Sequence, residues 1–174
     1  ITNYQSSFIL SPQESPMPLP TSIVLIGAGS SEFAENTFSS LIRSERLRGS
    51  KLALVDINPE SLEVNRRLAE RLNREWDSQM TISAHADYRE ALEGARFVVN
   101  AIEVGARENL WKRDFEIPLK HGVRQPYAEN GGPGGFAHAA RNIGPILQIA
   151  RDMEKVCPEA WFVNFTNPMV RICD

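Results

Sequence analysis

Short apolar runs alternate with longer amphipathic stretches from Thr21 to the end of the chain. The apolar runs are rich in β-branched residues and stop at glycine or polar residues, which is typical of buried strands. The longer stretches repeat apolar residues at helical spacing. The predicted strands are residues 22–26, 51–57, 80–84, 97–102 and 161–165. The predicted helices are residues 31–47, 59–76, 88–93 and 136–156, with a partly helical segment at 110–122 and a glycine-rich loop at 125–135.

The regular succession of strand and helix favours parallel strands joined by right-handed crossovers. The sequence therefore predicts an α/β fold built on a doubly wound parallel sheet. Residues 21–174 form one domain in this prediction, and the proline- and serine-rich residues 1–20 are expected to be a flexible leader. The helix after Pro59 carries its predicted apolar stripe on Val64, Leu68, Leu72 and Trp76.

The overall composition excludes several classes of partner. The formal net charge is −3 and no apolar stretch is long enough to span a bilayer, so we expect no nucleic-acid partner and no membrane association. Cys157 and Cys173 are too few for a disulfide framework and fit a reducing compartment. The predicted location is therefore the cytoplasm.

The first predicted strand leads directly into a glycine turn, Gly27-Ala28-Gly29-Ser30, and then into a helix. Glycines let the backbone approach a pyrophosphate closely, and the helix N-terminus presents free N–H groups to it. Asp56, at the end of the second strand, is placed to bind ribose hydroxyls and to repel a 2′-phosphate. These five residues predict the NAD site of a Rossmann-type domain like that of lactate and malate dehydrogenases. The motif lacks the usual third glycine, and an ordinary glycine turn beside a strand-end aspartate is the alternative.

Three other polar residues are candidates for ligand contacts. Asn100 interrupts the apolar run of the fourth strand, where it is either a cofactor contact or a core asparagine with protein partners. Glu129 precedes a glycine-rich loop that feeds a helix N-terminus, and the alternative is a plain surface loop. Asn167 ends the fifth strand before a proline, where it either binds a ligand or forms a strand-to-helix turn.

Histidine and cysteine give little support for a metal site. His85, His121 and His138 each lack a second ligand at metal-binding spacing, so they are expected to be structural or exposed. His138 lies nearest to the glycine-rich loop. Cys173 is a candidate metal ligand without a visible partner, and a packing thiol is the alternative.

Several short segments occur together in an order that resembles a known family. They are I-G-A-G-S at 26–30, V-D-I at 55–57, G-A-R-F-V-V at 94–99, V-G at 104–105, I-P-L-K-H-G at 117–122, G-P-G-G at 132–135 and N-F-T-N-P-M at 164–169. Over roughly residues 21–172 the chain resembles glycoside hydrolase family 4, the NAD- and manganese-dependent α-glucosidases, α-galactosidases and 6-phosphoglycosidases.

The resemblance implies a glycosidase that works by redox elimination. In that family NAD takes a hydride from C3 of the sugar, a base removes the C2 proton, and the glycosidic oxygen is eliminated before water and hydride return. NAD and a divalent metal, usually Mn2+, are the implied cofactors, and a small glycoside is the implied substrate. Position by position, Gly27, Gly29, Ser30 and Asp56 look like the NAD site. Glu129 and Asn167 look like substrate-binding residues.

The family's metal ligands and its catalytic tyrosine lie beyond the matching segments. We therefore expect the catalytic residues in a C-terminal substrate and metal domain that this chain lacks, and we expect the chain alone to be inactive. Cys173 follows Pro168 too closely to match the family's metal-binding cysteine. Glu103 stands where members that act on 6-phosphosugars often carry arginine, which favours a non-phosphorylated or differently charged glycoside, although Arg107 close by leaves the question open. We expect the whole enzyme to be a homo-oligomer.

Two other functions remain open on the residues alone. A 2-hydroxy-acid dehydrogenase of the lactate/malate type would use Arg107 or Arg113 to hold its substrate and a later histidine for catalysis, although G-P-G-G is not expected there. The second open function is that of a non-catalytic NAD-binding module.

Overall fold

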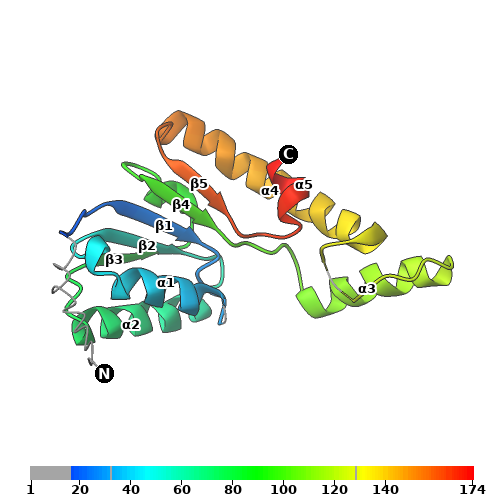
Figure 1. The fold of residues 1–174 in the computed structure, drawn as a ribbon, viewed down its shortest axis with the longest axis horizontal. Coiled ribbons are helices and arrows are strands. Elements are labelled where there is room, and N and C mark those ends of the chain that lie inside the picture. Colours follow the sequence, from blue (N-terminus) through cyan, green and yellow to red (C-terminus); the bar gives the residue numbers. More distant parts are fainter. Residues whose placement is uncertain (1–16, 32, 128) are drawn as a thin grey trace, which may run out of the picture.

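Five parallel strands form one sheet in the order β3-β2-β1-β4-β5 (Figure 1). The computed structural model describes residues 17–31, 33–127 and 129–174. The strands are β1 (Ser22–Ile26), β2 (Lys51–Val55), β3 (Thr81–His85), β4 (Phe97–Asn100) and β5 (Trp161–Asn164). This order, with β1 and β4 adjacent at the centre, confirms the predicted Rossmann-type sheet.

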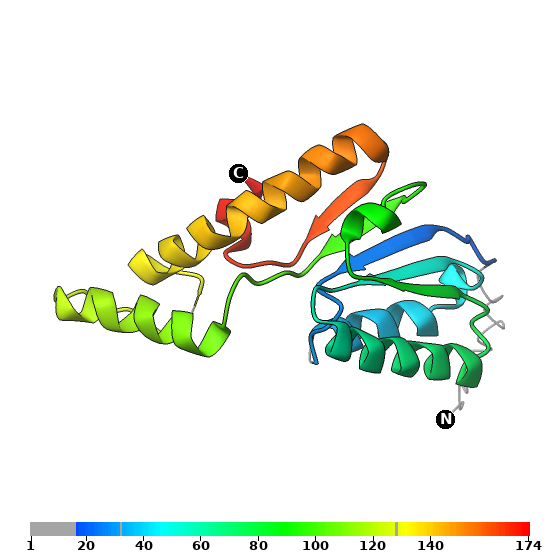
Figure 2. The same ribbon diagram turned by 180° about the vertical axis from the view of Figure 1, so that it is seen from behind.

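Helices cover the sheet on both sides. α1 (Phe33–Arg43) and α2 (Pro59–Glu75) lie on one face, and α4 (Gly132–Val156) lies on the other (Figures 1 and 2). α3 (Arg107–Lys120) extends past the sheet and packs against α4, while the short α5 (Met169–Cys173) follows β5. None of the described helices is long and apolar enough to cross a bilayer.

Strand β1 is buried on both of its faces, which explains its unbroken apolar run. Ile23 and Leu25 pack into a core shared with α1 and α2. Val24 and Ile26 point the other way, into a core that includes residues of α4. A central strand of a parallel sheet has no solvated face, so every position favours an apolar side chain.

The predicted leader falls mostly outside the described residues, which begin at Met17. The backbone N–H of Leu19 donates to the carbonyl oxygen of Arg46 in η1 (Glu45–Leu47), a single 3-10 turn. Leu19 is therefore attached to the domain.

Two predicted helices are shorter than expected. The segment 31–47 is divided, because Ser44 adopts an extended conformation (φ −73°, ψ 114°) that ends α1 before η1 begins. Residues 88–93 form only the 3-10 turn η2 (Tyr88–Ala91). Asp87 caps the start of η2, where its carboxylate accepts a hydrogen bond from the backbone N–H of Arg89.

The core-facing stripe of α2 differs from the predicted one. Leu68 and Leu72 pack against the core as expected, but Val64 is 65% exposed and Trp76 is 42% exposed. The fully packed positions are instead Leu62, Asn65 and Ala69. The buried stripe thus includes a polar residue, Asn65, which an apolar pattern cannot reveal.

The glycine-rich segment was predicted as a loop up to residue 135, and this is wrong for residues 132–135. Helix α4 begins at Gly132, with Pro133 in the first turn, where its missing N–H costs no helical hydrogen bond. A Cβ on Gly134 would lie 2.8 Å from the carbonyl oxygen of Asp114, and one on Gly135 would lie 2.9 Å from the backbone of Asn130. These glycines serve close packing at a helix N-terminus, and chain flexibility is not their role.

Phe38→Ala tests the core under α1. Phe38 is fully buried against the sheet, so removing its ring should lower the free energy of unfolding by about 3–5 kcal/mol. Urea denaturation followed by circular dichroism measures this loss. Val64→Ala, on the exposed side of α2, is the matched control and should change stability by no more than about 0.5 kcal/mol. Equal losses for the two variants would contradict the assigned packing.

Candidate functional site

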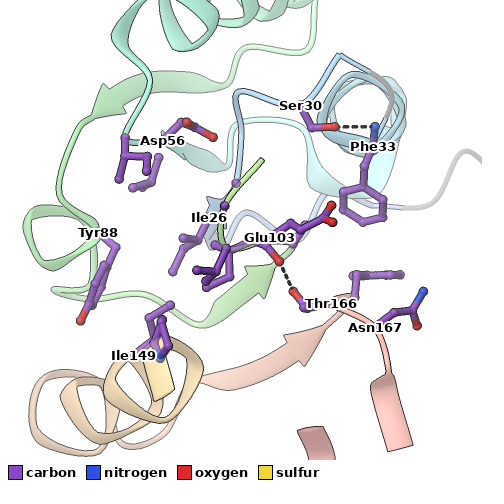
Figure 3. Close-up of a pocket in the computed structure, with 18 of the residues that line it drawn as sticks. Ile26, Ser30, Phe33, Asp56, Tyr88, Glu103, Ile149, Thr166 and Asn167 are labelled. Atoms are coloured by element: carbon purple, nitrogen blue, oxygen red, sulfur yellow. Dashed lines mark hydrogen bonds between the residues drawn. The ribbon is translucent and has the colours of Figure 1, made fainter. Parts of the chain in front are cut away.

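A cavity of about 810 Å³ runs along the carboxyl ends of the strands (Figure 3). Its lining includes one residue or more from the segment that follows each strand: Gly27, Asp56, Ala86, Ile102 and Phe165. Ligands of open α/β sheets bind at this edge, where the strand order reverses. The volume falls within the range of small-molecule sites.

Both glycines of the predicted turn lie so close to other segments of the chain that a side chain would not fit at either position. Gly27 has a φ of +92°, and a Cβ there would lie 2.6 Å from the carbonyl oxygen of Ala101. A Cβ on Gly29 would lie 2.6 Å from the carboxyl carbon of Asp56. The turn therefore fits closely between the segment after β4 and the acid after β2.

The Asp56 carboxylate is held against this turn. One of its oxygens accepts a hydrogen bond from the backbone N–H of Gly29 at 2.7 Å, and the other accepts from the backbone N–H of Asn58 at 2.8 Å. The structure thus brings together two parts of the predicted cofactor site, the glycine turn and the ribose acid.

Two other side chains support the turn. The Asn65 amide donates to the carbonyl oxygens of Ala28, at 2.7 Å, and Ser30, at 3.2 Å. The Ser30 hydroxyl oxygen accepts from the backbone N–H of Phe33 at 3.1 Å, which caps the start of α1 (Figure 3). Sequence reasoning missed Asn65. Its only signal was a polar residue among the apolar positions of a helix.

Asn100 is fully buried, and its amide oxygen has no hydrogen-bond partner among the described residues. Its amide nitrogen donates to the side chains of Asn164, at 2.8 Å, and Thr166, at 3.1 Å. The Thr166 hydroxyl in turn donates to the carbonyl oxygen of Ile102 at 2.7 Å (Figure 3). Asn100 thus links the segments that follow β4 and β5 through its amide nitrogen, and its role as a cofactor contact stays a prediction.

The two predicted substrate-binding residues meet in the cavity. The Asn167 amide nitrogen donates to a carboxylate oxygen of Glu129 at 2.8 Å, and both residues line the cavity wall. They come from the segments before α4 and after β5. This pair offers an amide and a carboxylate to a polyhydroxyl ligand.

A second acid, Glu103, lines the same region. One of its oxygens accepts from the Arg107 guanidinium at 2.6 Å, and the other accepts from the indole N–H of Trp111 at 2.9 Å. The Arg107 guanidinium also lies 5.4 Å from the centre of the Trp111 ring. Trp111 was not predicted as a site residue, because nothing in the sequence places α3 beside the strand ends.

His138 lies in the wall of the cavity and is almost fully buried. Its position in the cavity wall was not predicted from the sequence. Its ring stands edge-on to Trp111, with 6.2 Å between centroids. Burial lowers its pKa below the ordinary value of 6.5, while the nearby charge of Glu103 acts weakly in the opposite direction. The imidazole is therefore neutral at pH 7.

The described residues offer no metal site. No group of three or more histidine, cysteine, aspartate or glutamate side chains among them is arranged to hold an ion. Cys173 is exposed, lies outside the cavity lining and has its sulfur 3.9 Å from the Asn164 amide nitrogen. The candidate metal ligand thus has no partner ligand within this part of the chain.

Comparison with known families settles the relationship that the motifs suggested. Residues 22–174 match the model of the family 4 glycosyl hydrolases. The chain belongs to this family. An α-glucosidase from Erwinia rhapontici is 46% identical over 155 residues, which is 89% of this chain and 34% of the relative.

Solved structures agree with this assignment. The 6-phospho-β-glucosidase from Thermotoga maritima, solved with manganese, NAD+ and glucose-6-phosphate, superposes with a TM-score of 0.74 at 27% identity, over 84% of this chain and 35% of that one. A lactate dehydrogenase from Cryptosporidium parvum shares the fold alone, with a TM-score of 0.58 at 15% identity, over 90% of this chain and 41% of that one. The chain spans about a third of the length of the family members it matches.

The buried His138 predicts a pH-dependent stability. Because its pKa in the folded chain lies below 6.5, the unfolded chain binds the proton first as the pH falls through about 6.5. The free energy of unfolding should then decrease by at most about 1.4 kcal/mol per pH unit until the folded pKa is reached. His138→Phe should remove this part of the slope in urea titrations between pH 7.5 and 5. A slope unaffected by His138→Phe would refute the assignment.

Proposed function

We propose that this chain is the NAD-binding part of a glycosidase that cleaves O-glycosidic bonds by redox elimination, on a non-phosphorylated glycoside. The observation that carries the proposal is the contact between Asp56 and Gly29 at the mouth of a strand-end cavity, in a chain of the family 4 glycosyl hydrolases. The 6-phospho-β-glucosidase from Thermotoga maritima, which shares this fold, was solved with NAD+.

The residues fit the dinucleotide. The turn from Gly27 to Ser30 leads into α1, so a pyrophosphate bound there would lie at the favourable end of the helix dipole. Asp56 borders the cavity as an acceptor for the ribose hydroxyls. Its negative charge disfavours the 2′-phosphate of NADP.

The other end of the cavity is proposed to hold the sugar. Glu129 and Asn167 would bind its hydroxyl groups through the carboxylate and the amide. When bound, NAD supplies an acceptor for a hydride from the sugar and later returns it. In this scheme the chain's own residues bind and orient the ligand and exclude water, and the base that removes the C2 proton is supplied from outside the chain.

The described residues do not fit the family's metal, because no three of their histidine, cysteine, aspartate or glutamate side chains are grouped to hold an ion. The metal would be held by the part of the whole enzyme that lies outside these residues. The catalytic tyrosine of the family has no counterpart in the matching segments either. We therefore propose that the isolated chain binds NAD without turnover, and that the whole enzyme works in the cytoplasm as a homo-oligomer.

The dehydrogenase alternative loses its support. The likeness to lactate dehydrogenase is limited to the fold, whereas the family match covers residues 22–174. Arg107, one of the arginines considered for holding a hydroxy acid, is bound to Glu103.

Asp56 variants test the cofactor assignment. Calorimetry should show that wild-type protein binds NAD+ and that NADP+ binds at least about tenfold more weakly. Asp56→Ala should weaken NAD+ binding about 10- to 100-fold, because charge-assisted hydrogen bonds to the ribose are lost. Asp56→Asn keeps the shape of the side chain and removes its charge, so it should narrow the gap between NAD+ and NADP+. Wild-type protein that is folded and binds neither dinucleotide would overturn the proposal.

Glu103 variants test the substrate class in the complete enzyme supplied with NAD+ and Mn2+. The wild-type kcat/KM should favour 4-nitrophenyl glucosides over their 6-phosphates, because a carboxylate repels a phosphate. Glu103→Gln should shift this preference about tenfold toward the phosphorylated substrate. A wild-type enzyme that prefers the 6-phosphate would refute the non-phosphorylated assignment and leave the family unaffected.

A further inference from the structure

Glu103 lies in a short segment between the end of β4 and the start of α3 that is neither helix nor strand. Its side chain lines the cavity. The backbone groups of such a segment have no regular partners, so other parts of the chain must bind them if the segment is to keep one conformation. The partners of this segment therefore decide where the Glu103 carboxylate lies.

Both peptide bonds of Glu103 are held by buried side chains. In the peptide bond before it, the Ile102 carbonyl oxygen accepts from the Thr166 hydroxyl at 2.7 Å. In the peptide bond after it, the Val104 N–H donates to the Asn142 amide oxygen at 2.9 Å. Thr166 is 5% exposed and Asn142 is fully buried. Because each peptide bond is planar, fixing both of them restricts the φ and ψ of Glu103 and hence the direction of its side chain.

Asn142 has the features of a residue that holds a neighbouring segment. It lies on the buried face of α4, where the other buried side chains include Ile146, Ile149 and Met153. Its amide nitrogen donates to the carbonyl oxygen of His138, one turn earlier, at 2.9 Å. The amide nitrogen and oxygen each have a partner, so the orientation of the side chain is determined.

The carboxylate of Glu103 is held as well as its backbone. As described above, Arg107 and Trp111, both on α3, each donate to one of its oxygens. The acid therefore cannot turn away from a ligand without breaking hydrogen bonds. A fixed acid discriminates between a neutral and an anionic ligand more strongly than a mobile one, because a mobile side chain can move away from the anion.

We propose that Asn142 and Thr166 are positioning residues that fix Glu103 in the cavity and so determine how strongly it selects neutral over phosphorylated glycosides. The inference rests on the proposed function, in which Glu103 disfavours a 6-phosphate. Neither residue needs to touch the ligand in this role. Both act through the backbone on either side of the acid.

The Trp111 indole N–H reports the position of Glu103 without any substrate. In 15N–1H spectra, Asn142→Leu and Thr166→Val should move the indole signal of Trp111 toward its position in Glu103→Ala, which lacks the acceptor. Thr166→Ser keeps the hydroxyl and should leave the signal near its wild-type position. Trp111→Phe identifies the signal.

The effect on selectivity is measured in the complete enzyme with NAD+ and Mn2+, on 4-nitrophenyl glucosides and their 6-phosphates. Asn142→Leu and Thr166→Val should each reduce the preference for the neutral substrate, as a ratio of kcat/KM values, about fivefold. Thr166→Ser should retain most of it. In a Glu103→Gln background, Asn142→Leu should change the ratio little further, because the two residues act through the same interaction.

Asn73→Leu is the matched control for a loss of stability. The Asn73 side chain also binds the backbone twice, to the N–H and the carbonyl oxygen of Met80 at 2.9 Å each. It does so just before β3, at the edge of the sheet opposite the cavity. Asn73→Leu should lower stability and leave both the Trp111 signal and the substrate ratio at their wild-type values.

Three results would count against the proposal. An unchanged Trp111 signal and substrate ratio in both Asn142→Leu and Thr166→Val would overturn it, and Thr166→Val keeps the test decisive if Asn142→Leu does not fold. Equal losses of kcat/KM on the two substrates, matched by Asn73→Leu, would reduce both residues to a structural role. A wild-type enzyme that prefers the 6-phosphate would overturn the proposed substrate class and the selective role of Glu103, while the Trp111 signal would still decide whether the two residues position the acid.

Discussion

The contact between the Asp56 carboxylate and the Gly29 amide depends on the parallel pairing of β1 with β2. That pairing places Ile26 opposite Val55, so the turn after one strand and the acid after the other emerge at the same edge. The carbonyl oxygen of Val55 accepts hydrogen bonds from the N–H groups of both Gly27 and Ala28, at 2.9 Å each. The cofactor half of the site is thus an extension of the hydrogen-bond pattern of the sheet, and a change in register would separate its two parts.

The half of the site that contains Glu129 and His138 is held in place by helix packing. α3 and α4 pack together beyond the sheet, where Gly134 allows the first turn of α4 to approach the carbonyl oxygen of Asp114. The Arg141 guanidinium forms an ion pair with the Asp114 carboxylate between the same helices, with one N–O distance of 3.0 Å. This packing brings Glu129 and His138 to the cavity. The end of the cavity that we propose holds the sugar is therefore positioned by helix packing, whereas the end that we propose holds the cofactor is positioned by strand pairing.

A buried polar network lies between these two halves. Asn100 and Asn164 are partners in the register of β4 and β5, and Thr166 connects them to the segment that carries Glu103. The hydrogen bonds from the Asn100 amide nitrogen and the Thr166 hydroxyl hold the two segments together, while the Asn100 amide oxygen is buried without a partner among the described residues. The placement of Asn167 relative to Glu103 follows from it.

The sequence by itself determined the alternation of strands and helices, the glycine turn and the acid of the cofactor site. These depend on local periodicity, on turn chemistry and on the rule that parallel strands end at one edge. Only the tertiary structure decided that Asn100 is fully buried, that α4 begins at Gly132 and that Trp111 and His138 reach the cavity. The meeting of Glu129 with Asn167, 38 residues apart, was likewise beyond a sequence pattern. Each of these features arises from packing between segments far apart in the chain, and a local sequence pattern cannot predict such contacts.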